Sequence, residues 1–417
     1  MTRATGLAAY VAVTAAYWAF MLTDGALRML VLLHFHSLGF SPIQLAYLFV
    51  FYEIAGVVTN LGAGWIAARF GLTKTLYAGL GLQVVALLAL AQLDPAWAVG
   101  FSVLYVMAVQ GLSGVAKDLA KMSAKSAVKL LAPQGGDGLF RAVAGLTGSK
   151  NAVKGLGFLL GAALLAMFGF TPAIVGMAVI LGLVLAGVLI GMPAGLPTGR
   201  RDAKFREVFS TNRNINWLSF ARVFLFGARD VWFVVGIPIY FQAVLSDGSA
   251  AGDRVSFFIV GGFMAVWVIL YGAVQAGAPK ILGSATRPQA ALIADARRWA
   301  GLLAVVPGVL ALLAVLAGGP QMWLTITLVV GLLAFGALLG VNSSLHSYLI
   351  LAFSRQDRVT MDVGFYYMAN AAGRLMGTVL SGVSYQIGGL PLCLATAGAL
   401  VLASRFGAGR LGDRQPV

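Results

Sequence analysis

The sequence has a single cysteine, Cys393, and three histidines among its 417 residues. One thiol excludes a disulfide within the chain, and it excludes iron–sulfur and zinc sites that need several cysteines. The sequence also lacks a spaced set of metal ligands, a nucleophile motif and a glycine-rich phosphate loop. We therefore expect no metal, no cofactor and no catalytic residue, and the pattern argues against an enzyme.

Charged residues are scarce as well. They make up 10% of the chain, whereas 60% is hydrophobic, and the mean hydropathy is +0.89. This composition excludes an ordinary soluble domain and is typical of a polytopic membrane protein. The 53 glycines fit this class, because small residues let membrane helices approach closely. The first apolar run lacks a small-residue cleavage site, so we expect a spanning helix there rather than a cleaved signal peptide.

Long apolar segments predict an all-α membrane protein with twelve transmembrane helices. Their approximate ranges are 7–33, 43–68, 74–93, 97–125, 142–168, 171–192, 214–244, 255–279, 299–318, 321–350, 360–386 and 388–405. The longest polar break, 193–213, is expected to be a cytoplasmic loop. It separates an N-terminal six-helix half (1–192) from a C-terminal six-helix half (214–417).

The formal net charge of +15 could indicate a nucleic-acid partner. The distribution argues otherwise, because most Lys and Arg residues fall in loops on one side and only Arg254 falls in a loop on the other. This asymmetry follows the positive-inside rule, which places both termini in the cytoplasm. We expect a multi-pass monomer in the inner (plasma) membrane, with basic loops against lipid headgroups and no nucleic-acid partner.

The spans retain charged residues that topology does not explain. The basic ones are Arg28, Lys117, Lys121, Lys150, Lys154, Arg222, Arg229 and Arg374. The acidic ones are Asp24, Glu53, Asp118, Asp230 and, at a span edge, Asp362. Charges inside a bilayer are unfavourable and usually have a function. The predicted spans hold eight basic and five acidic residues, an excess of about three positive charges. This excess indicates a cavity for an anion.

For several of these residues two or more interpretations remain open. Asp24 and Arg28 are four residues apart on one helix face, so they could form a structural ion pair or share a binding site. The same holds for Arg229 and its neighbour Asp230. Glu53 has no basic residue nearby in its own helix, so it could be neutral, carry a proton or pair with Arg28.

The lysines of the fourth and fifth spans could likewise form ion pairs or bind a ligand. Lys117 could face a cavity or pair with its neighbour Asp118. Lys150 and Lys154 share one helix face, and no acid in their own helix is spaced to neutralise them. Acids on another helix, water or an anionic ligand could compensate them, although Lys150 could also snorkel to the inner surface.

A polar stripe on the eleventh span carries Tyr367, Asn370 and Arg374 on one helix face. Arginine suits tetrahedral oxyanions, because its planar fork donates two parallel hydrogen bonds. This stripe is therefore a further candidate for anion binding.

The two halves of the chain echo each other. Asn151 in the fifth span matches Asn370 in the eleventh, and each is followed within four residues by a base, Lys154 and Arg374 respectively. Two repeated six-span halves around a central cytoplasmic loop resemble the major facilitator superfamily. The segment Gly64–Lys74 resembles the loop motif of that superfamily, with Gly64, Arg69 and Gly71 as its gating residues. The acidic position of the motif is lost here, since it holds Ala68.

The charged stretches resemble a narrower group, the organoarsenical efflux permeases of the ArsJ family. The matching segments are Tyr17–His36, Phe51–Asn60, Ala116–Ser126, Thr147–Ala152, Lys154–Gly155, Ala221–Arg222, Leu225–Trp232 and Gly364–Asn370. The resemblance implies export of 1-arseno-3-phosphoglycerate, which a functional partner, glyceraldehyde-3-phosphate dehydrogenase, makes from arsenate in the cytoplasm. Extrusion of this unstable compound would give arsenate resistance.

The sequence thus predicts a secondary transporter that works by alternating access, with its site between the halves. The substrate-binding candidates are Arg28, Lys117, Lys150, Lys154, Arg229, Tyr367, Asn370 and Arg374. The candidates for charge pairing or coupling are Asp24, Glu53, Asp118 and Asp230. An organophosphate or phosphate antiporter is the alternative function, and a membrane-embedded sensor or enzyme is less favoured.

Overall fold

The computed structural model describes residues 3–131, 138–192, 210–283, 287–354 and 359–412 of the chain. Every regular element in these ranges is a helix. The first seven helices are α1 (Arg3–Ser37), α2 (Pro42–Tyr47), α3 (Val50–Phe70), α4 (Leu72–Leu90), α5 (Val99–Leu131), α6 (Gly138–Phe168) and α7 (Phe170–Gly191). The others are α8 (Arg213–Val231), η1 (Trp232–Gly236), α9 (Ile237–Leu245), α10 (Ala250–Leu282), α11 (Gln289–Ala317), α12 (Met322–Phe353) and α13 (Val359–Ala408).

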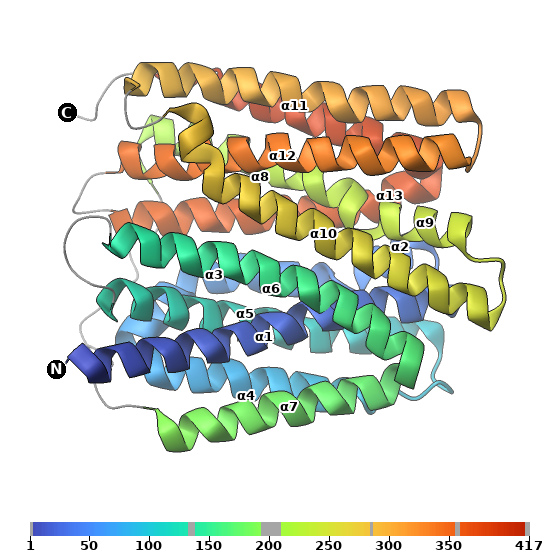
Figure 1. Ribbon diagram of the computed structural model, residues 1–417, viewed down its shortest axis with the longest axis horizontal. Coiled ribbons are helices and arrows are strands. Elements are labelled where there is room, and N and C mark those ends of the chain that lie inside the picture. Colours follow the sequence, from blue (N-terminus) through green and yellow to red (C-terminus); the bar gives the residue numbers. More distant parts are fainter. Residues whose placement is uncertain (1–2, 132–137, 193–209, 284–286, 355–358, 413–417) are drawn as a thin grey trace.

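The long helices lie side by side along the longest axis of the molecule (Figure 1). Within the described ranges, eleven segments are long and apolar enough to cross a membrane. The last of them, Gly364–Ala408, has 45 residues, about 68 Å of helix, whereas a bilayer core is about 30 Å thick. Its backbone leaves the helical region at Gly388 and Gly389, so α13 contains two crossings. The all-α membrane fold and its twelve spans are confirmed.

Two predicted spans are interrupted. The second consists of α2 and α3, and α2 begins with a capping box in which the side chains of Ser41 and Gln44 each bind the other's backbone N–H. The seventh consists of α8, the π-helical turn η1 and α9, where Pro238 occupies the first turn of α9. A proline lacks the backbone N–H that continues a helix, and π-turns of this kind often occur at functional sites.

Glycines set the tightest helix crossings. Helix α6 meets α1 at Gly157, where an added Cβ would lie 2.5 Å from the carbonyl oxygen of Leu22. Helix α13 meets α8 at Gly377, where an added Cβ would lie 2.5 Å from the carbonyl oxygen of Gly227. Only glycine permits backbones to come this close. A close glycine contact thus joins the first span to the fifth, and another joins the seventh to the eleventh.

The helices on either side of the central break meet along two seams. Helix α6 packs on α10, and α3 packs on α13. On the first seam Gly155 faces the backbone of Ala265, and beside the second seam the side chain of Ala46 in α2 packs on Gly382 of α13. Residues 193–209 lie outside the described ranges, so the division of the chain at 193–213 stays a prediction.

The segment that resembles a gating loop joins α3 to α4. Gly64 and Arg69 lie in α3, and Gly71 forms the break between the two helices with φ of 85°. This is the left-handed region that favours glycine, so Gly71 permits the break between α3 and α4. The side chain of Arg69 is outside the described part of the chain.

The α1–α6 crossing gives a test of the packing. We expect Gly157→Ala to lower Tm by several degrees, because a methyl group forced into a tight contact costs about 1–3 kcal/mol. Gly176→Ala in α7 is the matched control, since nothing lies within 4 Å of a Cβ at that position. Thermal unfolding of both variants in detergent is the measurement, and equal Tm values would contradict the crossing.

Candidate functional site

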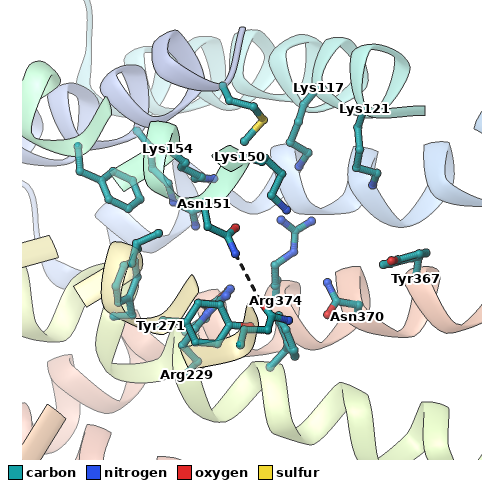
Figure 2. A pocket seen from close by; sticks show the side chains of 18 of the residues that line it. Lys117, Lys121, Lys150, Asn151, Lys154, Arg229, Tyr271, Tyr367, Asn370 and Arg374 are labelled. Atoms are coloured by element: carbon teal, nitrogen blue, oxygen red, sulfur yellow. Dashed lines mark hydrogen bonds and ion pairs between the residues drawn. The ribbon is translucent and has the colours of Figure 1, made fainter. Parts of the chain in front are cut away.

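A cavity of about 210 Å³ lies between α1, α5 and α6 on one side and α8, α10 and α13 on the other. All eight basic residues of the predicted spans line it. Among the described lining residues, Asp230 is the one carboxylate. In Figure 2 the labelled lysines of α5 and α6 point toward the middle of the cavity, opposite Arg374, Asn370 and Tyr367 of α13. Residues far apart in the sequence thus form a single, strongly basic site.

Glu53 is fully buried and binds two arginines. Its Oε1 lies 3.2 Å from Nη1 of Arg28 on α1, and its Oε2 lies 3.0 Å from Nη2 of Arg374 on α13. Of the interpretations left open by the sequence, pairing across to Arg28 is therefore observed, and Arg374 is an additional partner. One carboxylate on α3 connects helices from both sides of the cavity.

Asp24 binds a different partner from the one that its spacing suggested. Its Oδ2 accepts a hydrogen bond from Nζ of Lys154 at 3.0 Å, and its Oδ1 accepts one from the hydroxyl of Tyr52 at 2.5 Å. The expected pair with Arg28 is replaced, because the close α1–α6 crossing at Gly157 brings Lys154 against Asp24. An acid on another helix thus compensates Lys154, which is one of the three possibilities that the sequence left open.

Asp118 pairs with Lys121 rather than with Lys117. Nζ of Lys121 lies 2.6 Å from Oδ1 of Asp118, and the hydroxyl of Thr59 donates to Oδ2 at 2.9 Å. Lys121 also donates to the side-chain oxygen of Asn60 at 2.6 Å. The partnership between Lys117 and Asp118, proposed as one of two alternatives, is not the arrangement observed.

Lys117 lies over an aromatic ring. Its Nζ is 3.9 Å from the centre of the Tyr52 ring, and 5% of the residue is exposed. Its ammonium group makes no hydrogen bond to any described residue. Lys117 therefore lines the cavity without a carboxylate of the described residues within ion-pair distance, and its ammonium group lies against the face of a ring.

Arg229 pairs with its sequence neighbour, since Nε lies 2.6 Å from Oδ1 of Asp230. Its guanidinium also lies 4.8 Å from the centre of the Phe226 ring. The structural ion pair considered for these two residues is thus present, and both residues line the cavity.

Arg222 was counted among the basic residues but not proposed as a substrate ligand. Its Nε donates to Oδ1 of Asn370 at 3.0 Å, and its Nη1 donates to the hydroxyl of Ser343 at 2.9 Å. Asn370, a predicted substrate ligand, therefore holds an arginine. The seven-residue spacing from Arg229 was the available signal, because it puts both arginines on one face of α8.

The remaining candidates have separate positions along the cavity. Tyr367 and Lys150 both line it, and the ring of Tyr367 lies 5.8 Å from Nζ of Lys121. Beside them, Asn151 donates to Gln275 at 3.4 Å, the bond drawn from Asn151 in Figure 2. No cluster of metal-ligating side chains occurs in the described ranges.

Solved structures resemble this chain over nearly its full length. One is a POT family transporter in complex with 5-aminolevulinic acid, with a TM-score of 0.70, 13% identity and coverage of 95% of this chain and 94% of that chain. Another is a proton-dependent oligopeptide transporter, with a TM-score of 0.69, 13% identity and 96% of each chain covered. A third, a POT family transporter with a thioalcohol-conjugated peptide, has a TM-score of 0.71, 13% identity and coverage of 95% and 94%.

The chain therefore shares the all-helical fold of these transporters. At 13% identity the likeness shows the fold alone. Neither a protein-family model nor a curated protein sequence matches the chain. The multi-pass membrane architecture follows from the fold together with the eleven apolar segments.

The Glu53 bridge can be tested with a double-mutant cycle. Glu53→Gln leaves Arg28 and Arg374 without their shared carboxylate, so we expect a loss of about 3–5 kcal/mol in unfolding free energy. Adding Arg374→Gln removes one of the two stranded charges, so the double variant should be no less stable than Glu53→Gln alone. Unfolding in detergent is the measurement. Lys74→Gln, at an exposed lysine of α4, is the control and should be additive with Glu53→Gln. Additive losses for Glu53 and Arg374 would rule out the bridge.

Proposed function

We propose that this chain is a secondary active transporter that exports a small organic anion, 1-arseno-3-phosphoglycerate, by alternating access. The observation that carries the proposal is the cavity lined by eight basic side chains and, among its described residues, one carboxylate. The fold supports transport, since the similar solved structures are of transporters.

The balance of charge favours an anionic ligand. Four buried carboxylates, Asp24, Glu53, Asp118 and Asp230, form ion pairs with cavity cations. Eight cations against four carboxylates leave an excess of positive charge in a region of low dielectric constant. Buried charges are unfavourable unless they are paired. An anion that enters the cavity would offset this excess and be held by it.

The size of the cavity favours a small ligand. Its volume of about 210 Å³ is below the roughly 300–1,000 Å³ of pockets for drug-sized molecules. A three-carbon compound with oxyanion ends belongs to this size class. Arginine forks suit tetrahedral oxyanions, and Arg28, Arg222, Arg229 and Arg374 all line the cavity.

A zwitterion such as the ligands named for the neighbouring structures fits less well. Its ammonium group would need a free carboxylate in the cavity wall. The one carboxylate among the described lining residues is Asp230, and Arg229 already occupies it. The comparison with peptide transporters therefore supports the fold of this chain but not their substrate class.

The choice of an arsenical over other organic anions rests on the resemblance of the charged stretches to the ArsJ family. In that reading the glyceraldehyde-3-phosphate dehydrogenase supplies the substrate in the cytoplasm, without physical contact with the transporter. The chain would reside in the inner membrane as a monomer with both termini cytoplasmic. A phosphate or organophosphate antiporter would use the same basic cavity and is the second candidate.

Glu53 is well placed to couple substrate binding to movement. It binds Arg28 on α1 and Arg374 on α13 at the same time. An anion that displaces Glu53 from Arg374 would remove a link between the two sides of the cavity. Asp24, Asp118 and Asp230 would hold the other bases in the absence of substrate.

Uptake into everted membrane vesicles tests the proposal. Everted vesicles with the chain in their membrane should accumulate arsenic from a medium that contains glyceraldehyde-3-phosphate dehydrogenase, its substrates and arsenate. Lys150→Gln, Lys154→Gln and Arg374→Gln should each lower uptake about ten- to a hundredfold, because a charged hydrogen bond contributes about 1.5–3 kcal/mol. Lys74→Gln, which replaces an exposed lysine outside the cavity, should transport normally.

Competition separates the two transport candidates. Excess inorganic phosphate or glycerol 3-phosphate should inhibit arsenic uptake only weakly if the arsenical is the substrate. Complete inhibition, together with uptake of labelled phosphate, would favour the antiporter instead. Normal arsenic uptake by all three cavity variants would refute the anion site itself.

A further inference from the structure

Five cavity cations have a carboxylate partner among the described residues. These are Arg28, Lys121, Lys154, Arg229 and Arg374. A cation that is paired with a carboxylate must break that ion pair before it can bind another anion in its place. The cations without a carboxylate are therefore the ones prepared to receive a ligand directly.

Lys117 on α5 is such a cation. It is 5% exposed, and its ammonium group makes neither a hydrogen bond nor an ion pair with any described residue. The neighbouring Asp118 is bound to Lys121 instead. The Tyr52 ring beneath it, 3.9 Å away, offers a cation–π contact, which is weaker than the ion pair that a buried ammonium group normally forms. A buried, unsatisfied charge that lines a cavity points to a ligand.

Arg222 on α8 is the second. It is 4% exposed, and no carboxylate of the described residues lies within ion-pair distance. Neutral groups fix two of its nitrogens: Asn370 accepts from Nε, and Ser343 accepts from Nη1 through both its hydroxyl and its carbonyl. The Phe226 and Tyr366 rings lie 3.9 Å and 5.0 Å from its guanidinium carbon.

The surroundings of Arg222 hold its guanidinium in one orientation. Ser343 is itself anchored, because Tyr271 and Gln275 donate to its hydroxyl at 3.2 Å and 3.3 Å. The second terminal nitrogen, Nη2, donates to no described residue, and Arg222 lines the cavity. The neutral acceptors orient the guanidinium of Arg222 without cancelling its charge. Preorganised anion sites hold their charged donors in this way.

We propose that Lys117 and Arg222 are the two anchors of the substrate, each binding one anionic end of a small organic anion that carries two. Lys117 belongs to the N-terminal side of the cavity and Arg222 to the C-terminal side, so the ligand would span both. This inference rests on the proposed function and assigns the two anionic ends of its substrate to two residues. It also makes Arg222 a specificity-determining residue.

Binding of stable probes to the purified protein tests this inference. The probes are 3-phosphoglycerate, which carries a phosphate and a carboxylate, and glycerol 3-phosphate, which has the same carbon chain and only the phosphate. We expect wild-type protein to bind the two-ended probe at least tenfold more tightly in calorimetry. Lys117→Met and Arg222→Lys should each reduce that preference to less than threefold, while Lys74→Gln should preserve it.

Thermal stability provides an independent readout that does not require a ligand. Lys117→Met removes a buried charge without a carboxylate partner, so Tm should stay the same or rise. Lys154→Met strands Asp24, so Tm should fall. A fall in Tm for Lys117→Met equal to that for Lys154→Met would show that Lys117 is a structural residue and would overturn its role as an anchor.

The outcomes separate this inference from the proposed function. Equal affinity for the two probes, or an unchanged preference in both anchor variants, would overturn the two-anchor site and leave an anion transporter standing. If the wild-type protein bound neither probe nor inorganic phosphate, the anion cavity itself would be refuted, and the anchors with it.

Discussion

The buried carboxylate of Glu53 is the interaction on which the rest of the site depends. It lies between Arg28 and Arg374, which come from helices on opposite sides of the cavity. Without a carboxylate between them, two guanidinium groups in a region of low dielectric constant would repel each other. Glu53 therefore allows the walls of a strongly basic cavity to stay together in the absence of a ligand.

The other carboxylates act in the same way on a smaller scale. Asp24 binds Lys154, Asp118 binds Lys121, and Asp230 binds Arg229. The charge of each of these cations is therefore balanced by a carboxylate, which also takes up hydrogen-bond donors that a ligand would need. Lys117 and Arg222 differ, because a ring face and neutral acceptors surround them. Buried charges without a charged partner are unfavourable for stability, and a ligand that pairs with them would account for their presence, as proposed above.

Much of this arrangement is visible in the sequence. Apolar length predicts the twelve spans, and the count of charges within them identifies all eight basic residues that line the cavity. This works because a charge inside a bilayer is rare enough to be informative without knowledge of the fold. The partners of those charges could be predicted only in part. The pairs Glu53–Arg28 and Arg229–Asp230 were among the alternatives that the sequence left open. Asp24 is four residues from Arg28 yet binds Lys154, because the glycine crossing of α1 and α6 decides which side chains meet.

Arg222 is a second residue whose contacts could not be predicted from the local sequence. Its neighbours Asn370 and Ser343 come from α13 and α12, more than a hundred residues away. Asp230 follows Arg229 directly in the sequence and is its partner, whereas nothing in the local sequence around Arg222 indicates that Asn370 and Ser343 would bind it. Composition and periodicity thus identify the residues of the site. Which of its cations are paired with a carboxylate depends on packing between distant helices.

The most direct test of an anion-binding cavity is to locate a bound arsenic atom. Crystals of the protein grown with arsonoacetate, a stable compound with an arsonate and a carboxylate, would give anomalous scattering at the arsenic absorption edge. An anion site predicts one strong peak inside the cavity, next to Lys117 or Arg222. Arsenic peaks only on the outer surface, or none at all, would contradict it.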